Sequence, residues 1–199
     1  MNLITRGFHG RRGGDPDRIP PGQYQTHDFP VLTVGPTPRV DTDTWTLTIT
    51  TETGTRHTWT WRQLLDLPQE NPHTDIHCVT RWTKLDTDWT GVSLDTLLHD
   101  VETTADYALA HSHGGYTTNL PLQDLTDGQA WIAHTFDGRP LTPEHGGPAR
   151  LLVPHLYFWK SAKWISGLTL HHEDEPGFWE QAGYHDYGDP WREQRYQGD

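Results

Sequence analysis

The sequence predicts an α+β fold that is rich in β-structure, with mixed sheets and short helices in a single domain. Three observations support this prediction. The chain has 199 residues, which is the length of one domain. Fifteen prolines and 19 glycines are spread along it, so long helices are excluded. Apolar and polar residues alternate in several short runs, which is the period of a β-strand.

Strands are expected where this alternation is clearest. In residues 44–50, Trp45, Leu47 and Ile49 fall on one face and threonines fall on the other, which is typical of a strand with one solvated face. Further strands are expected over residues 55–61, 75–79, 107–112, 129–136, 149–157 and 163–172.

The helices are expected to be short. Residues 93–101 are the best candidate, because Ser93 can cap the first turn and three leucines form one apolar face. Shorter helical turns are expected over residues 62–68 and 120–125. A loop is expected after Thr80, bracketed by two tryptophans, Trp82 and Trp89.

The two ends of the chain differ in composition. Residues 1–20 are rich in glycine, proline and arginine and predict an irregular N-terminal arm, which leaves residues 21–199 as the domain. The C-terminal segment from residue 173 onward is polar but carries six aromatic residues. A disordered tail would not usually hold so many, so this segment is expected to pack back onto the domain.

Charge and composition narrow the partners and the compartment. The formal net charge of −12 argues against a nucleic-acid partner, since phosphate backbones bind basic proteins. No run approaches the roughly 18 apolar residues of a membrane span. Arg11-Arg12 is followed by Gly-Gly-Asp-Pro instead of an apolar signal core, and a single cysteine cannot form an internal disulfide. A cytoplasmic location is therefore expected.

The single cysteine, Cys78, is the first candidate for chemistry. It follows a short strand, His77 and Arg81 lie nearby, and positive charge favours the thiolate. Three interpretations stay open at this point. Cys78 can be a small buried apolar residue, a nucleophile with a histidine base, or the one protein ligand of a metal carried by a sulfur-rich cofactor.

A basic segment is the second candidate. Residues 144–168 hold Gly146-Gly147-Pro148, then Arg150, and then two of the three lysines of the chain in the stretch FWKSAKW. Arg150, Lys160, Ser161 and Lys163 offer a rigid guanidinium fork, point charges and a hydroxyl, which together suit a phosphate group. A zinc site is a weaker alternative, because His111, His113, His171 and His172 match no tight zinc spacing.

On these motifs the chain resembles the sulfite oxidase family of molybdopterin-dependent oxidoreductases. It is most similar to the stand-alone bacterial branch, which includes the catalytic subunit of the periplasmic methionine sulfoxide reductase. The matching pieces are HCVTRW with WTGVSLDTLL, and HGGPARLLVP with KSAKW. Weaker flanks are HDFPVL near residue 27 and GFWEQAGYHDYG near the end, so the resemblance covers residues 20–190 approximately.

The resemblance implies a β-rich fold around one molybdenum–pyranopterin, with Cys78 as the protein's sulfur ligand to molybdenum. It implies that the pterin and its phosphate are held by His145, Arg150, Ser161, Lys163 and the backbone of Ala162, and that His27 lies beside the cofactor. Tyr184 corresponds to a tyrosine near the metal, and with Arg81 it is the candidate for contacting substrate. Trp82 or Trp89 would form walls.

The activity that the resemblance implies is two-electron redox chemistry, as oxygen-atom transfer to or from a small-molecule substrate. A separate electron donor or acceptor would close the cycle. The chain departs from sulfite oxidases at Thr26, where they have an arginine, and in the spacing of Arg81, so sulfite is not implied as substrate. Two alternatives remain: a metal-free thiol enzyme with Cys78 as nucleophile, and a non-catalytic module that binds the pterin.

Overall fold

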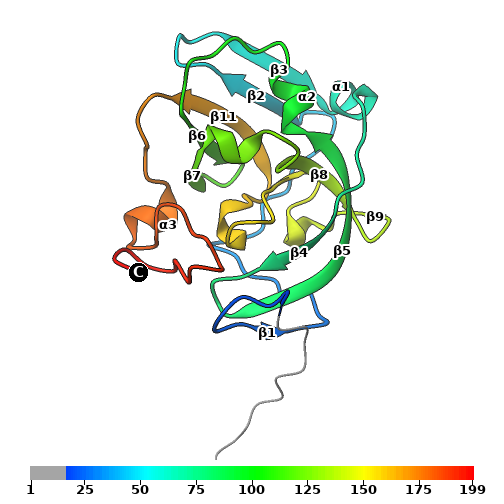
Figure 1. Cartoon of the computed structure of the whole chain (residues 1–199). Coiled ribbons are helices and arrows are strands. Elements are labelled where there is room, and N and C mark those ends of the chain that lie inside the picture. Colours follow the sequence, from blue (N-terminus) through cyan, green and yellow to red (C-terminus); the bar gives the residue numbers. More distant parts are fainter. Residues whose placement is uncertain (1–16) are drawn as a thin grey trace, which may run out of the picture.

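Two β-sheets with a few short helices make up the part of the chain that the computed structural model describes, residues 17–199 (Figure 1). The first sheet has five strands in the order β3-β2-β11-β6-β7. Neighbours in it are antiparallel except β2 and β11, which are parallel. Its strands are β2 (Thr46–Thr50), β3 (Arg56–Thr60), β6 (Tyr107–Ser112), β7 (Thr117–Pro121) and β11 (Ile165–His171).

The second sheet has six strands, with the order β1-β5-β8-β10 and with β4 and β9 paired at its side. Strand β5 is 12 residues long and pairs with β4 at one end and β8 at the other. In Figure 1 it runs as one long curved strand along the side of the molecule. The strands are β1 (Tyr24–Gln25), β4 (His73–His77), β5 (Trp82–Ser93), β8 (Trp131–Phe136), β9 (Arg139–Pro140) and β10 (Arg150–Leu152).

The helices are short, and two of them begin at a side-chain cap. Thr60 and Gln63 form a capping box at the start of α1, and Ser93 accepts a hydrogen bond from the Thr96 amide at the start of α2. The α-helices are α1 (Trp61–Asp66), α2 (Leu94–Leu98) and α3 (Phe178–Gln181). Three 3-10 turns are η1 (Leu122–Leu125), η2 (Pro143–His145) and η3 (Phe158–Lys160).

The main core is built by the inward faces of the strands. Leu47 and Ile49 of β2 and Leu168 and Leu170 of β11 are fully buried, and Leu94 of α2 packs in the same cluster. A second apolar cluster belongs to the six-stranded sheet and includes Ile76, Cys78, Trp82 and Trp89. The candidate thiol therefore lies in an apolar cluster at the end of β4.

The predicted fold class is confirmed: the protein is a single, sheet-rich domain with short helices. The loop expected after Thr80 is wrong, because the chain turns over Cys78–Arg81 and enters β5 at once. This strand looks polar in sequence because it contains Thr83 and Thr87, which are buried, and Asp86 and Asp88, which are exposed. The strand expected over residues 149–157 ends at Leu152, and residues 120–121, expected as helical, belong to β7.

Both ends of the described chain lie against the domain. Residues 1–16, which hold most of the expected arm and its twin arginine, lie outside the described residues. Arg18 pairs with Asp75 and Asp86 at distances of 2.6 and 2.7 Å, on the β4–β5 hairpin. At the other end, the Tyr184 ring lies 5.2 Å from that of Trp159.

Candidate cofactor site

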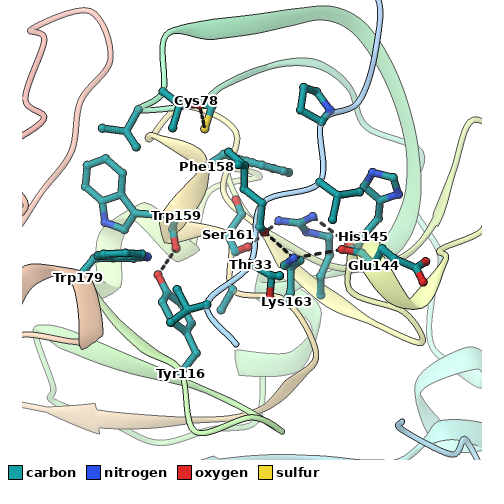
Figure 2. A pocket seen from close by; sticks show the side chains of 18 of the residues that line it. Thr33, Cys78, Tyr116, Glu144, His145, Phe158, Trp159, Ser161, Lys163 and Trp179 are labelled. Carbon is teal, nitrogen blue, oxygen red and sulfur yellow. Dashed lines mark hydrogen bonds between the residues drawn. The ribbon is translucent and has the colours of Figure 1, made fainter. Parts of the chain in front are cut away.

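A cavity of about 310 Å³ brings together segments that are far apart in the sequence. It is walled by residues 29–34, by the turn after β4, by the region from η2 to β10, by residues 158–159 and 161–164 and by the aromatic tail. Figure 2 shows Cys78 on one side of Phe158 and the group of Glu144, His145 and Lys163 on another. The cavity thus has a thiol end and a basic end.

The backbone around Cys78 is fixed by a tight turn. The Cys78 amide donates to the Trp82 carbonyl at 2.8 Å, and the Arg81 amide donates to the Cys78 carbonyl at 2.9 Å. Arg81 closes the turn with a φ of +79°, in the left-handed region. The Gln23 side chain donates a second hydrogen bond to the Cys78 carbonyl at 3.1 Å. The thiol is therefore held in one position.

The thiol itself is buried and has one polar neighbour. Cys78 is 6% exposed, and the Thr80 hydroxyl donates a hydrogen bond to its Sγ at 3.1 Å. Burial raises the pKa of Cys78 above its ordinary value, which the hydrogen bond from Thr80 only partly opposes. Without a metal, this thiol is protonated at neutral pH.

Arg150 forms the centre of the basic end. It is 2% exposed, and its guanidinium donates to the His145 carbonyl at 2.9 Å and to the Ser161 carbonyl at 2.7 Å. Its Cζ lies 4.0 Å from the centre of the Phe158 ring. Burial lowers the pKa of Arg150 to about 9. Within residues 17–199, no carboxylate forms an ion pair with this buried cation.

Lys163 adds a second cation beside Arg150. Its Nζ donates to the Leu32 carbonyl at 2.7 Å and to the Glu144 carbonyl at 3.1 Å. Burial, and then repulsion by Arg150, lower the pKa of Lys163 to about 8. Two adjacent cations without a carboxylate partner in the described chain make a site for an anion, since a buried charge is stable only when it is paired.

Backbone groups at the basic end also suit an anion. The N–H groups of Ala162 and Lys163 have no hydrogen-bond acceptor among the described residues. Free successive N–H groups next to cations are a frequent way to hold a phosphate. The Ser161 hydroxyl, in contrast, accepts a bond from the Val153 amide at 2.9 Å, so it also supports the local backbone.

Glycine allows this end to be so compact. A Cβ on Gly146, whose φ is +105°, would lie 3.0 Å from Cβ of Arg150 and 3.1 Å from Cγ of Lys163. A Cβ on Gly147 would collide with the Leu141 carbonyl. The glycine pair therefore lets η2 approach the protein's own cations, whereas the sequence had indicated only a close approach to some neighbour.

The thiol end is walled by aromatic rings from η3 and the tail. Trp159 and Trp179 lie 5.2 and 4.9 Å from Tyr184, measured between ring centroids, and all three line the cavity. Burial raises the pKa of Tyr184, with smaller contributions from Tyr196 and from Cys78. Its hydroxyl has no hydrogen-bond partner in the described chain, so it is a free, protonated donor at neutral pH.

The structure brings most of the predicted site residues to the cavity. Cys78, His145, Arg150, Ser161, Ala162, Lys163 and Tyr184 all line it. His27 and Arg81 do not: the His27 carbonyl accepts a bond from Lys84, and the Arg81 side chain is exposed. Trp82 forms a wall as expected, whereas Trp89 lies outside the lining.

Lys160 is a correction to the predicted basic cluster. It is fully buried and forms an ion pair with Glu180 at 2.7 Å, and its Nζ also donates to Asn119 and Asp186. It therefore supports the fold behind the cavity and is not available to an anion. The zinc alternative also lacks support, because residues 17–199 contain no group of three or more metal-binding side chains.

Sequence reasoning missed several residues of the wall. Residues 29–34 cross the basic end, where His145 Nε2 lies 3.0 Å from the Phe29 carbonyl and its ring stacks on Phe29 at 4.0 Å. Only the weak flank HDFPVL pointed to them. Tyr116, Trp159 and Trp179 were also missed as lining residues, although Trp159 lies in FWKSAKW and Trp179 in the flank GFWEQAGYHDYG, because an aromatic residue does not by itself indicate a cavity wall.

A sheet-rich domain with a buried thiol and a paired-cation anion site in one cavity fits a protein that binds a phosphorylated cofactor carrying a soft metal. Comparison with known families agrees. The family model described as "Oxidoreductase molybdopterin binding domain" matches residues 34–179, and the chain belongs to this family. It is a sulfite-oxidase-like molybdopterin oxidoreductase, and its cofactor is molybdenum–molybdopterin.

Three similar proteins illustrate the relationship. The chain is 41% identical to the protein named Uncharacterized oxidoreductase YuiH of Bacillus subtilis (strain 168), over 95% of this chain and 97% of that one. It is 30% identical to the mitochondrial sulfite oxidase of Rattus norvegicus, over 35% of this chain and 13% of that one. The crystal structure of the sulfane dehydrogenase SoxCD from Paracoccus pantotrophus shares the fold, with a TM-score of 0.62 at 19% identity, covering 69% of this chain and 41% of that one.

The cavity residues fit this cofactor. A buried soft thiol suits molybdenum, and paired cations with free amides suit the phosphate of the pterin.

No helix within residues 17–199 has the length and apolar character that crossing a bilayer requires.

Proposed function

We propose that the protein catalyses oxygen-atom transfer to or from a small-molecule substrate, with Cys78 as the protein's sulfur ligand to molybdenum. The observation that carries the proposal is a single cavity that contains a buried thiol and, apart from it, Arg150 and Lys163 without carboxylate partners among the described residues. A phosphorylated metal cofactor needs both features at once.

The residues at the basic end would hold the cofactor. Arg150 and Lys163, with the N–H groups of Ala162 and Lys163, would bind the phosphate through charge-assisted hydrogen bonds. His145 would support the pterin from its position on Phe29. His27 stays a prediction as a cofactor neighbour.

The residues at the thiol end would support the reaction. When bound, the cofactor supplies a molybdenum centre that exchanges two electrons and an oxygen atom. Cys78 would bind the metal as a thiolate, which metal coordination favours over the protonated thiol. Tyr184 would donate a hydrogen bond to the substrate oxygen, since its raised pKa keeps the hydroxyl protonated. Arg81 stays a prediction as a substrate contact at the rim.

A metal-free thiol enzyme is less well supported. The Cys78 thiol has a raised pKa, and Thr80 is its only hydrogen-bond partner among the described residues. His77, the neighbour in sequence, bonds Thr83 instead, and burial lowers the pKa of His77 to about 4. A nucleophilic cysteine needs a base or a positive charge at the sulfur, and neither is present in this part of the chain.

Metal analysis tests the proposal. Wild-type protein from a host that makes the cofactor should carry stoichiometric molybdenum, and Cys78→Ser should lose most of it while circular dichroism stays unchanged. Wild-type protein without molybdenum, together with rapid alkylation of Cys78 by iodoacetamide at neutral pH, would favour the thiol enzyme instead. Bound pterin without electron transfer to or from any dye would favour a non-catalytic module.

The proposal includes a separate electron donor or acceptor, because oxygen-atom transfer exchanges two electrons that a second partner has to supply or accept. The cytoplasmic location expected from the sequence stays a prediction, which fractionation of cells and immunodetection of the chain would test.

A further inference from the structure

The turn that holds Cys78 also places a hydroxyl group on its sulfur. Residues 78–81 form a turn that is closed by the Arg81 amide, which donates to the Cys78 carbonyl at 2.9 Å. Thr80 is the third residue of this turn, and its hydroxyl donates to Cys78 Sγ at 3.1 Å (Figure 2). Both residues line the cavity, so the turn brings a hydrogen-bond donor to the sulfur at the thiol end.

The turn does not need this bond for its own stability. The Cys78 amide donates to the Trp82 carbonyl at 2.8 Å, and the Gln23 side chain donates to the Cys78 carbonyl, so the backbone is fixed without Thr80. Thr80 is exposed, so water can hydrate its hydroxyl in place of the sulfur. The sulfur of a neutral thiol is only a weak acceptor, whereas a thiolate accepts a charge-assisted hydrogen bond. The contact therefore becomes strong when the sulfur carries charge.

The surroundings of the sulfur make a single donor effective. Cys78 is buried and belongs to an apolar cluster with Ile76, Trp82 and Trp89. A hydrogen bond is electrostatically stronger in such a low-dielectric environment than in water. Hydrogen bonds to a sulfur ligand are also one of the means by which a protein sets the reduction potential of a metal centre. The Thr80 hydroxyl is in the right place for this role.

We propose that Thr80 is a positioning residue that raises the reduction potential of the molybdenum by donating a hydrogen bond to the sulfur of Cys78. This inference rests on the proposed function, in which Cys78 is the metal ligand. The bond withdraws electron density from the sulfur, and the reduced metal, which carries more negative charge, is stabilised by it more than the oxidised metal is. The hydroxyl keeps its proton throughout, so Thr80 takes no part in the transfer itself.

A redox titration of the holoenzyme tests this inference, with electron paramagnetic resonance of the one-electron-reduced metal as the readout. Thr80→Val removes the hydroxyl and keeps the shape of the side chain. It should lower the reduction potential by roughly 59 mV for a one-electron couple, which corresponds to a tenfold change in the equilibrium constant. Thr80→Ser keeps the donor and should restore a potential close to that of the wild type. Thr80→Ala is a second variant without the hydroxyl, for use where circular dichroism shows that Thr80→Val does not fold.

Thr33→Val is the matched control. Thr33 also lines the cavity, but its hydroxyl donates to the Gly35 carbonyl at 3.2 Å and makes no bond to the sulfur. In Figure 2, Thr33 lies apart from Cys78, next to Lys163. The same loss of a hydroxyl at this position should therefore leave the reduction potential unchanged. A shift as large as that of Thr80→Val would show that the potential responds to any polar change in the wall, and would overturn the inference.

Molybdenum is measured on the same samples, so this inference and the proposed function can fail separately. A molybdenum-loaded Thr80→Val protein with the wild-type potential would overturn the inference and leave the proposed function standing. Equal shifts in Thr80→Val and Thr80→Ser would also overturn it, because the hydroxyl would not be the cause. Loss of molybdenum from Thr80→Val alone would assign the hydroxyl to metal retention instead of tuning. Molybdenum that stays bound in Cys78→Ser would contradict the proposed function itself.

Discussion

Arg150 is the residue whose environment is hardest to explain by folding alone. Its guanidinium is buried, and its recorded partners are backbone carbonyls and the face of Phe158. Desolvation of this cation is unfavourable, and the described chain supplies no carboxylate to offset it. A bound phosphate would offset it, so the arrangement is understandable as a site that is organised before its ligand arrives.

Substitution of Arg150 should therefore weaken cofactor retention more than substitution of Arg81. Each charge-assisted hydrogen bond contributes about 1.5–3 kcal/mol, so Arg150→Ala should lower the affinity for cofactor by roughly tenfold or more. Arg150→Lys keeps the charge but loses the fork and should be intermediate. Pterin and molybdenum content after extensive dialysis measures the effect. Retention in Arg150→Ala together with loss in Arg81→Ala would reverse the assignment of the two ends.

Lysines 160 and 163 show the limit of sequence reasoning at this scale. Both lie in FWKSAKW, and the sequence groups them in one basic cluster. Only Lys163 lines the cavity, because Lys160 is directed into the core to meet Glu180, which is far downstream in the chain. Short-range motifs identify residue types that suit an anion, but a long-range ion pair decides which of them are free.

At the scale of elements, the alternating strands and capped helices were predictable and the long strand β5 was not. Thr83 and Thr87 are fully buried although threonine reads as polar. Asp86 and Asp88 on the outward side are exposed and add to the polar appearance. Thr83 lies opposite His77 and Thr87 lies opposite Thr74 of β4, and that pairing is a tertiary contact which local sequence does not contain.

Helix α3 carries Trp179 and is anchored by a buried ion pair, so breaking this pair should disturb the aromatic wall. Glu180 receives hydrogen bonds from Thr118 and Trp159 as well as pairing with Lys160. Glu180→Gln should lower the free energy of unfolding by about 3–5 kcal/mol, because a buried lysine is left without its counter-charge. Urea denaturation measures the stability, and near-ultraviolet circular dichroism reports the aromatic packing.

Glu173→Gln is the matched control, since it changes an exposed carboxylate in the same tail. Its effect should stay within about 0.5 kcal/mol, as for most surface substitutions. Equal stability of the two variants would show that the Lys160–Glu180 pair does not anchor α3.

Across the whole molecule, the cavity depends on parts of the chain that no single motif contains. Residues 29–34, the β4–β5 turn, the segment from η2 to residue 164 and the tail all contribute to its wall. The two central motifs predicted that Cys78, Arg150 and Lys163 belong to the site, because the residues of each motif are close together in the sequence. Residues 29–34 and the aromatic residues of the wall could not be assigned to the cavity from the sequence, because they reach it only through tertiary packing.

The paired cations also predict how the stability of the cofactor-free protein depends on pH. Folding lowers the pKa of Lys163 from 10.5 to about 8, so between these values the folded state binds fewer protons than the unfolded state. Stability therefore rises with pH across this interval. Relative to Lys163→Met, the wild-type protein should gain stability between pH 8 and 10, as urea midpoints would show. A bound phosphate keeps Lys163 protonated and should abolish this gain in the loaded protein, whereas a wild-type advantage that shrinks with rising pH would contradict the buried-cation account.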